Sequence, residues 1–313
     1  MRKIQKVKQS VLKKYDKISF LKSEVVELQG GLGNQLFGYA YAQYRAEINN
    51  HKVALDIKKL TKFGFQLKPF GVSIKAHMHI LKTLKEIQIT FQKNWLIHYF
   101  FTQIFKIIEK ISFRKIVSED DTVPKFYSRV LHQGYFQKIE YFSNYVYREV
   151  YKLRDNFQGT RLFNELNNQN IFTNSLAIHV RGGDYLKHSD IFLLPSSLYY
   201  KAAIEKLNPN NDIPMIVFTD DFEYAHKMIP HPKLIIDKSY NLTPADTMML
   251  MSKASKFIGA NSTFSWWAAL FRSSQYIPPI FPWPWLKNSS ETPDSLLPTN
   301  WNKITLDSFG NPA

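Results

Sequence analysis

The segment SLAIHVRGGDYL, residues 175–186, joins an apolar run to a charged, glycine-rich turn. His179 is the one polar residue within 176–180, and such a run predicts a strand buried in a parallel sheet. Arg181, two glycines and Asp184 follow directly. Ligands of open parallel sheets bind beyond the carboxyl ends of the strands, so this turn is a candidate binding site.

Segments on both sides of this turn alternate between strand and helix patterns. Downstream, the apolar segments MIVFTDD, KLIID and KFIGA are separated by helical stretches, which predicts βαβ units and a parallel sheet. Upstream, VVEL (25–28), a glycine turn, a helix over 36–48 and KVALDI form a strand–turn–helix–strand unit. The sequence therefore predicts an α/β protein. Residues 156–174 are expected to be a linker, and PPIFPWPWL (278–286) an irregular strap across the surface.

The overall charge indicates an anionic partner. The chain has 313 residues, a formal net charge of +15 and no cysteine, which excludes disulfides and thiolate chemistry. Nucleic acid, a phosphorylated small molecule and an acidic membrane surface all fit this charge. Residues 1–24 form a basic tail, read as a solvated segment or as a membrane tether. Residues 95–113 carry apolar side chains at helical spacing, which fits a buried hairpin or an interfacial helix equally well.

Three predicted strand ends carry the polar residues of a candidate anion site: Arg181 to Asp184, Thr219 to Asp221 and Asn261 to Thr263. Arg181 has a guanidinium that can bind phosphate oxygens bidentately, and the glycines beside it expose backbone amides. NSTFSWW, from Asn261, places a capping Ser or Thr at a helix start, where free N–H groups favour negative charge. These features predict a diphosphate-bearing ligand. A structural ion pair between Arg181 and Asp184 is the less favoured reading, and His179 is expected to be a satisfied core histidine.

The familiar nucleotide and metal motifs are absent from the sequence. GGLGNQLFG has Leu36 where a GxGxxG motif needs its third glycine, and no Gly-Lys pair forms a P-loop. Asp220 and Asp221 are adjacent and so do not form an Asp-x-Asp motif, and no His spacing suggests zinc. The site is therefore expected to neutralise a departing phosphate with arginine and backbone dipoles, without a metal.

Four segments, GGLGNQLFGYAYA, HVRGGDY, VFTDD and LMSKASKFIGANSTFSWWAALF, occur in an order that resembles the α-1,2-fucosyltransferases of glycosyltransferase family 11, especially bacterial members. The resemblance covers roughly Val25 to Trp285. It implies a GT-B-like α/β fold, with two Rossmann-like domains facing across a cleft. The implied parts are the tail 1–24, an acceptor-side domain 25–160 with a helical insertion around 75–115, and a GDP-fucose-binding domain 175–313 with a C-terminal strap.

The resemblance also implies a reaction and its partners. L-fucose would move from GDP-β-L-fucose to the 2-hydroxyl of a terminal β-galactoside, with inversion and without metal or cofactor. The expected setting is surface glycan or O-antigen (lipopolysaccharide) synthesis in the bacterial cytoplasm, with peripheral contact at the inner membrane face. No nucleic acid is expected. Two alternatives stay open: a catalytically inactive GDP-sugar-binding relative, and a basic nucleic-acid-binding protein.

The residues that the resemblance assigns fall into three groups. Arg181 matches an arginine on the β-phosphate of the donor, and Gly182 stands where many members carry a second arginine. Its backbone amide is expected to substitute in part. The catalytic group is Arg181, Asp184 and Asn34. The donor-binding group is His179, Arg181, Gly182, Gly183, Thr219, Asp220, Asp221, Asn261, Ser262, Thr263 and Phe264, and the acceptor-side group is Gly31, Gly33, Asn34 and Gln35.

Overall fold

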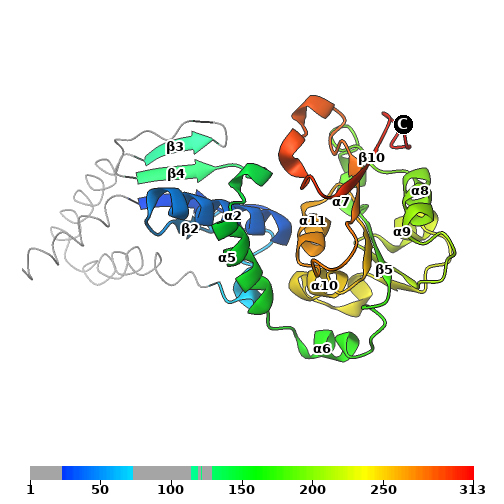
Figure 1. Ribbon diagram of the computed structural model, residues 1–313. Coiled ribbons are helices and arrows are strands. Elements are labelled where there is room, and N and C mark those ends of the chain that lie inside the picture. Colours follow the sequence, from blue (N-terminus) through cyan, green and yellow to red (C-terminus); the bar gives the residue numbers. More distant parts are fainter. Residues whose placement is uncertain (1–22, 73–113, 119–120, 122–128) are drawn as a thin grey trace, which may run out of the picture.

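The computed structural model describes residues 23–72, 114–118, 121 and 129–313, which form two parallel sheets (Figure 1). The first sheet has the order β2-β1-β4-β3 and the second has the order β10-β9-β8-β5-β6-β7. The strands are β1 (Ser23–Glu27), β2 (Ala54–Asp56), β3 (Arg114–Ser118), β4 (Arg129–Gln133), β5 (Leu176–Val180), β6 (Met215–Thr219), β7 (Leu234–Ile236), β8 (Lys256–Ile258), β9 (Ile280–Trp283) and β10 (Asn302–Thr305).

Helices cover both faces of the second sheet. Leu176 and Ile178 of β5 pack with α8 and α9, whereas Ala177, on the opposite face, belongs to the core that contains α10 and α11. His179 alternates with Ile178 and therefore faces the α10 and α11 side. The helices are α2 (Leu32–Asn49), α5 (Asn144–Asp155), α6 (Arg161–Asn167), α7 (Gly183–Lys187), α8 (Ser197–Leu207), α9 (Phe222–Met228), α10 (Pro244–Met251) and α11 (Thr263–Leu270).

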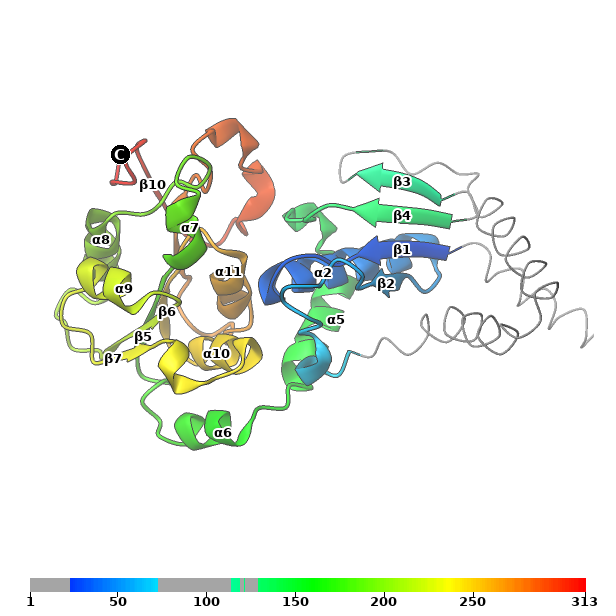
Figure 2. The same ribbon diagram turned by 180° about the vertical axis from the view of Figure 1, so that it is seen from behind.

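The two halves share one hydrophobic core. α2 of the first half packs against α11 of the second, and the two helices lie side by side in both views (Figures 1 and 2). The Phe37 ring lies 4.7 Å from the Trp266 ring and 5.2 Å from the Trp267 ring, and Phe142 closes the cluster. Trp266 and Trp267 are fully buried. The expected GT-B-like architecture is confirmed. Aromatic packing between α2 and α11 joins the two halves.

Some predictions fall outside the described residues. The tail 1–22, the aromatic segment 95–113 and the helical insertion up to residue 113 are among them. The last residues assigned to that insertion, 114 and 115, belong instead to strand β3. Among the helices that the structure describes, none is both long and apolar enough to cross a membrane.

The expected C-terminal strap is wrong, because Ile280–Trp283 forms strand β9 inside the second sheet. Four prolines in this stretch argued against a strand, since proline cannot donate a ladder hydrogen bond. The sheet tolerates Pro282 because β9 pairs with β8 only at Ile258 and Ile280. Pro282 therefore lies beyond the part of β9 that is flanked on both sides, next to β10 alone.

The expected linker 156–174 contains helix α6 and is fixed to the second half. Thr160 caps α6 by accepting a hydrogen bond from the Phe163 amide. The Thr160 amide and hydroxyl also donate to the carboxylate of Asp246 in α10, both at 3.0 Å. Because Phe163 and Leu166 are buried, this polar segment folds as a short amphipathic helix.

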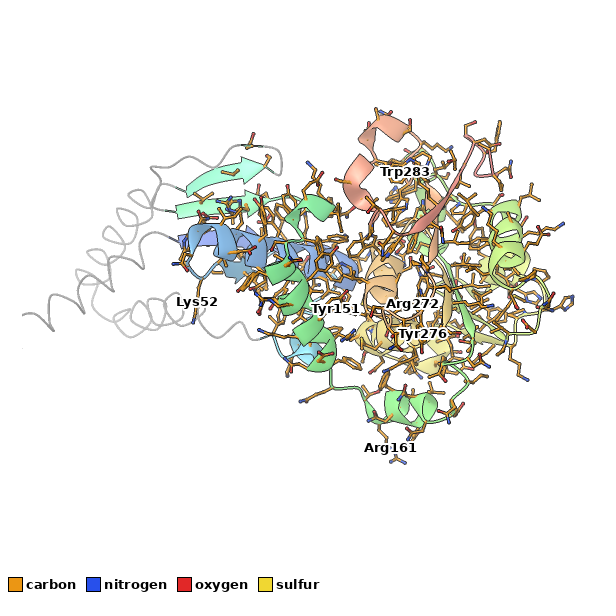
Figure 3. All side chains as sticks on the ribbon, in the orientation of Figure 1. Lys52, Tyr151, Arg161, Arg272, Tyr276 and Trp283 are labelled. Atoms are coloured by element: carbon orange, nitrogen blue, oxygen red, sulfur yellow. The ribbon has the colours of Figure 1, made fainter. Side chains whose placement is uncertain are left out.

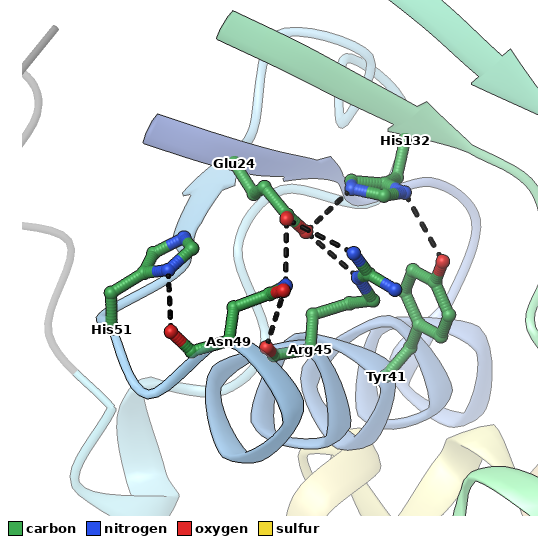
Figure 4. Close-up of polar contacts among 6 residues, drawn as sticks. All are labelled: Glu24, Tyr41, Arg45, Asn49, His51 and His132. Atoms are coloured by element: carbon green, nitrogen blue, oxygen red, sulfur yellow. Dashed lines mark hydrogen bonds and ion pairs between the residues drawn. The ribbon is translucent and has the colours of Figure 1, made fainter. Parts of the chain in front are cut away.

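A buried polar network fixes the amino end of β1, away from the β1–α2 turn (Figure 4). The Glu24 carboxylate accepts hydrogen bonds from Arg45 at 2.8 and 3.0 Å and from Asn49 at 2.7 Å. His132, fully buried, lies with Nε2 2.9 Å from Glu24 and Nδ1 3.1 Å from the Tyr41 hydroxyl. Nε2 donates to the carboxylate, and Nδ1 shares a hydrogen bond with the Tyr41 hydroxyl. The network ties β1 to β4 and to α2.

Glu24→Gln is expected to destabilise the protein in a pH-dependent way. At pH 7 the free energy of unfolding should fall by roughly 3 kcal/mol, because the half-buried Arg45 loses its counter-ion. Burial acts to raise the pKa of Glu24, but hydrogen bonds from His132 and Arg45 outweigh it and lower the pKa from 4.5 to about 2. The wild type should therefore lose stability as pH falls from 4.5 toward about 2, a loss that the variant lacks.

Urea unfolding of both proteins between pH 7 and pH 3 measures this difference. Glu165→Gln is the control, because Glu165 forms an exposed ion pair with Arg161 on α6. Parallel stability curves for wild type and Glu24→Gln would contradict the role given to the Glu24 carboxylate.

Candidate active site

A cavity of about 800 Å³ lies between the two halves. Its wall includes the N-termini of α2 and α11, so two sets of free backbone N–H groups and two helix dipoles meet there. Ser262 is the N-cap of α11 and accepts a hydrogen bond from the Phe264 amide, as the sequence predicts. Such helix ends favour a negatively charged ligand.

Arg181 lies on the cavity wall at the carboxyl end of β5, and two carboxylates hold its guanidinium. Nη2 is 2.6 Å from Asp184 and Nη1 is 2.8 Å from Asp220, and the guanidinium carbon lies 5.0 Å from the centre of the Tyr185 ring. The ion pair with Asp184, the less favoured reading of the sequence, is therefore present. The side chain remains 27% exposed, so a cavity ligand can reach it.

His179 lines the same cavity but is not the satisfied core histidine that the sequence predicts. Its Nδ1 is buried without a hydrogen-bond partner. Burial, helped by the charge of Arg181, lowers the pKa of His179 from 6.5 to about 3. The ring is therefore neutral at physiological pH, and its buried Nδ1 is unpaired.

Asn34 joins the two halves at the cavity wall. Its Oδ1 accepts a hydrogen bond from the Thr263 hydroxyl at 2.9 Å and one from the Gln137 amide at 3.2 Å. Gly33 makes this approach possible, because a Cβ atom at Gly33 would lie 2.6 Å from the backbone carbon of Thr263 and 2.8 Å from the Phe264 nitrogen. The first turn of α2 thus rests directly on the first turn of α11.

Other predicted site residues support the wall rather than form it. The Gly182 amide, expected to approach an anion, donates instead to Asp220 at 3.0 Å, and Gly183 adopts a φ of 42° close to the same carboxylate. Asp221 caps α9 through the Tyr224 amide. Neither glycine, nor Asp221, nor Gln35 lines the cavity, whereas Gly31, Thr219, Asp220, Asn261, Ser262, Thr263 and Phe264 do.

Two of these side chains fix the loops around the cavity. The Asn261 amide donates to the carbonyls of Leu193 and Trp285, which leaves its buried Oδ1 without a partner. Gln35 donates to the carbonyls of Gly30 and Gly64. Both residues therefore position backbone segments that line the cavity.

Sequence reasoning missed several cavity residues. Asp237 and Lys238 follow β7, at a strand end that the rule for parallel sheets would have identified. Tyr185 stacks on Phe192 with ring centres 3.9 Å apart. Phe63 and Tyr135 come from the first half, in segments without a motif. Across the residues that the structure covers, no group of three His, Asp or Glu side chains is arranged to hold a metal ion.

Two separate parallel sheets with a ligand-sized cavity between them fit the GT-B arrangement of glycosyltransferases that the sequence implies. The protein belongs to glycosyltransferase family 11, whose model matches residues 23–305.

Known proteins similar to this chain include two from Escherichia coli. An alpha-1,2-colitosyltransferase is 27% identical over 301 residues, covering 90% of this chain and 98% of that protein. The O-antigen biosynthesis glycosyltransferase WbnK is also 27% identical, over 316 residues, covering 91% and 98%. Among solved structures, the fucosyltransferase NodZ from Bradyrhizobium superposes with a TM-score of 0.45 at 12% identity, covering 80% of this chain and 93% of NodZ.

Proposed function

We propose that the protein is an inverting, metal-independent α-1,2-fucosyltransferase. It transfers L-fucose from GDP-β-L-fucose to the 2-hydroxyl of a terminal β-galactoside during surface glycan synthesis, in the bacterial cytoplasm. Family membership and the names of the two relatives support this proposal. The observation that carries it is the position of Arg181, at a strand end of the second half, where it lines the same cavity as the N-terminus of α11.

The reaction exchanges one bond to the anomeric carbon for another. The bond from that carbon to the β-phosphate oxygen breaks, and its electron pair stays on GDP. The galactoside oxygen forms the new bond on the opposite face and loses its proton to a carboxylate or to water on that face. Arg181 and the α11 N-terminus stabilise the negative charge that develops on the phosphate, which is where electrostatic catalysis has its greatest effect.

Asn34 serves this reaction as a hydrogen-bond donor and not as a base. Two donors, Thr263 and Gln137, already occupy its Oδ1. Its amide nitrogen is left to donate to an oxygen of either substrate. Asp184, which holds Nη2 of Arg181 at 2.6 Å, lies on the side of the departing phosphate and orients the guanidinium there.

Acceptor-dependent release of GDP tests this function. GDP-fucose is mixed with lactose or N-acetyllactosamine in the presence of EDTA, and free GDP is measured with and without the acceptor. Release that requires the acceptor and persists in EDTA is expected, and NMR of the product should show an α-1,2 linkage. Activity that EDTA abolishes and Mg²⁺ or Mn²⁺ restores would contradict metal independence. Binding of GDP-fucose without release for any galactoside would indicate an inactive relative.

GDP-colitose is a second candidate donor, because one relative is an α-1,2-colitosyltransferase. Colitose is L-fucose without its 3-hydroxyl, so the two GDP-sugars share the diphosphate and the anomeric carbon. Competition between equal concentrations of GDP-fucose and GDP-colitose, read by mass spectrometry of the product, separates them. An excess of the fucosylated product supports the first proposal, and an excess of the deoxy product would replace it with colitose transfer.

A further inference from the structure

Two aromatic rings of the first half stand exposed on the cavity wall. Tyr135 is 51% exposed and Phe63 is 43% exposed, and both line the cavity that holds Arg181. Large apolar rings left open to water inside a cavity are typical of ligand contacts rather than of folding. They come from different segments of the first half, the turn after β4 and the loop after β2.

The backbone holds Tyr135 rigidly. The carbonyl of Gly134 accepts a hydrogen bond from the Gln29 side chain at 2.9 Å. Phe136, with a φ of 54°, turns into the core and stacks on Tyr41 with ring centres 4.0 Å apart. A left-handed backbone is costly for an aromatic residue, and such conformations concentrate at functional sites. The next residue, Gln137, is bonded to Asn34. Tyr135 is therefore presented to the cavity by a segment that is fixed on both sides.

Phe63 is fixed in a similar way, through the residue that follows it. The amide of Gly64 donates to the carbonyl of Leu60, and its carbonyl accepts from Gln35 of α2, both at 3.0 Å. Lys62 places its ammonium 5.1 Å from the centre of the Phe63 ring. The loop that carries Phe63 is thus tied to the same helix turn that carries Asn34.

The opposite wall belongs to the second half and carries Arg181 and Tyr185. Burial is the main cause that raises the pKa of Tyr185 to about 12, and the Tyr135 phenol adds a smaller contribution. Tyr135 and Tyr185 line the same cavity, one from each half. A ligand that packs on Tyr135 is held in the same cavity as the Arg181 side chain.

We propose that Tyr135 and Phe63 form an acceptor platform that binds the apolar face of the terminal galactose ring. This inference rests on the proposed function. β-Galactose has one face on which three ring C–H groups point the same way, and the negative face of an aromatic ring attracts such hydrogens. Packing on the platform would hold the sugar beside the Asn34 amide. We assign the platform to the acceptor and not to the donor, because its residues and Asn34 all belong to the first half.

Tyr135→Ala and Phe63→Ala test the platform. Each variant is expected to raise the acceptor KM for N-acetyllactosamine by about three- to tenfold, the range for losing one aromatic contact. The dissociation constant for GDP, measured by titration calorimetry, should stay unchanged. Tyr135→Phe keeps the ring and should keep the wild-type KM. Phe309→Ala removes an 81%-exposed ring outside the cavity wall and is the matched control. Thermal unfolding midpoints verify that each variant is folded.

Three results would overturn the inference. These are an unchanged acceptor KM in both alanine variants, a GDP affinity that falls as much as KM rises, and a KM for Tyr135→Phe that matches Tyr135→Ala. If the wild type transfers no sugar, saturation-transfer NMR of N-acetyllactosamine in the presence of GDP tests acceptor binding directly. A signal in the wild type that is lost in Tyr135→Ala would support the acceptor platform even though the proposed transfer fails. No signal from the wild type would contradict the platform as well.

Discussion

Arg181→Ala is expected to lower kcat for fucose transfer by about 10²- to 10³-fold, the loss found when a preorganised transition-state donor is removed. The change takes away the guanidinium at the end of β5 and leaves Asp184 and Asp220 without their shared partner. Two carboxylates without a cation beside them then line the cavity and repel a diphosphate. The KM for GDP-fucose should therefore rise together with the fall in kcat.

Two further variants make this result specific. Arg181→Lys retains the charge but not the bidentate geometry and should fall between the wild type and Arg181→Ala. Arg161→Ala is the control, because Arg161 also pairs with a carboxylate but points into solvent from α6, where its side chain is 94% exposed (Figure 3). GDP release assays at saturating acceptor give kcat for each protein. Substantial activity in Arg181→Ala would remove this residue from the centre of the proposed mechanism.

Gly33→Ala is expected to impair both stability and catalysis. The added Cβ would overlap the backbone of Thr263 and Phe264, and backbone atoms cannot rotate away as a side chain can. The free energy of unfolding should fall by about 3 kcal/mol, the upper range for overpacking a close contact. Separating α2 from α11 also displaces Asn34 from Thr263, so kcat should fall by about 10²-fold, as for other misplaced catalytic groups.

The neighbouring glycine provides the control for Gly33. A Cβ at Gly31 would meet nothing within 4 Å, and Gly31 is the N-cap of the same helix. Gly31→Ala should therefore cost at most about 1 kcal/mol, through the poorer N-cap alone. Denaturant unfolding and kcat are measured for both variants. Equal effects of the two substitutions would mean that the contact between α2 and α11 does not depend on the small size of residue 33.

Sequence periodicity was sufficient to predict most of the fold. The strand at 176–180 and the helix that begins at 263 appear as predicted, because their apolar patterns are regular and their caps are local. Strand β9 was not predictable from local pattern, since its prolines are compatible with a strand only where a neighbour is missing. The tie from Thr160 to Asp246 joins residues 86 positions apart, which no local pattern contains.

The candidate site was predictable to the extent that it follows strand ends and helix starts. Arg181, Asp184, Thr219 and Asp220 come together on one wall because parallel strands end at the same edge of a sheet. The pairing of Gly33 with Thr263 depends on how two distant helices pack. Tyr135 and Phe63 have no sequence signal at all, since an exposed aromatic residue is recognised only when its surroundings are known.

The position of the Arg181 guanidinium between two carboxylates also affects the release of a bound nucleotide. A diphosphate that binds Arg181 shares the guanidinium with Asp184 and Asp220 and is repelled by both carboxylates, so its net affinity is lower than its contact with the arginine alone would give. The two carboxylates neutralise the arginine in part and so weaken its hold on a nucleotide that departs. A site built in this way favours repeated turnover over tight retention of the spent nucleotide.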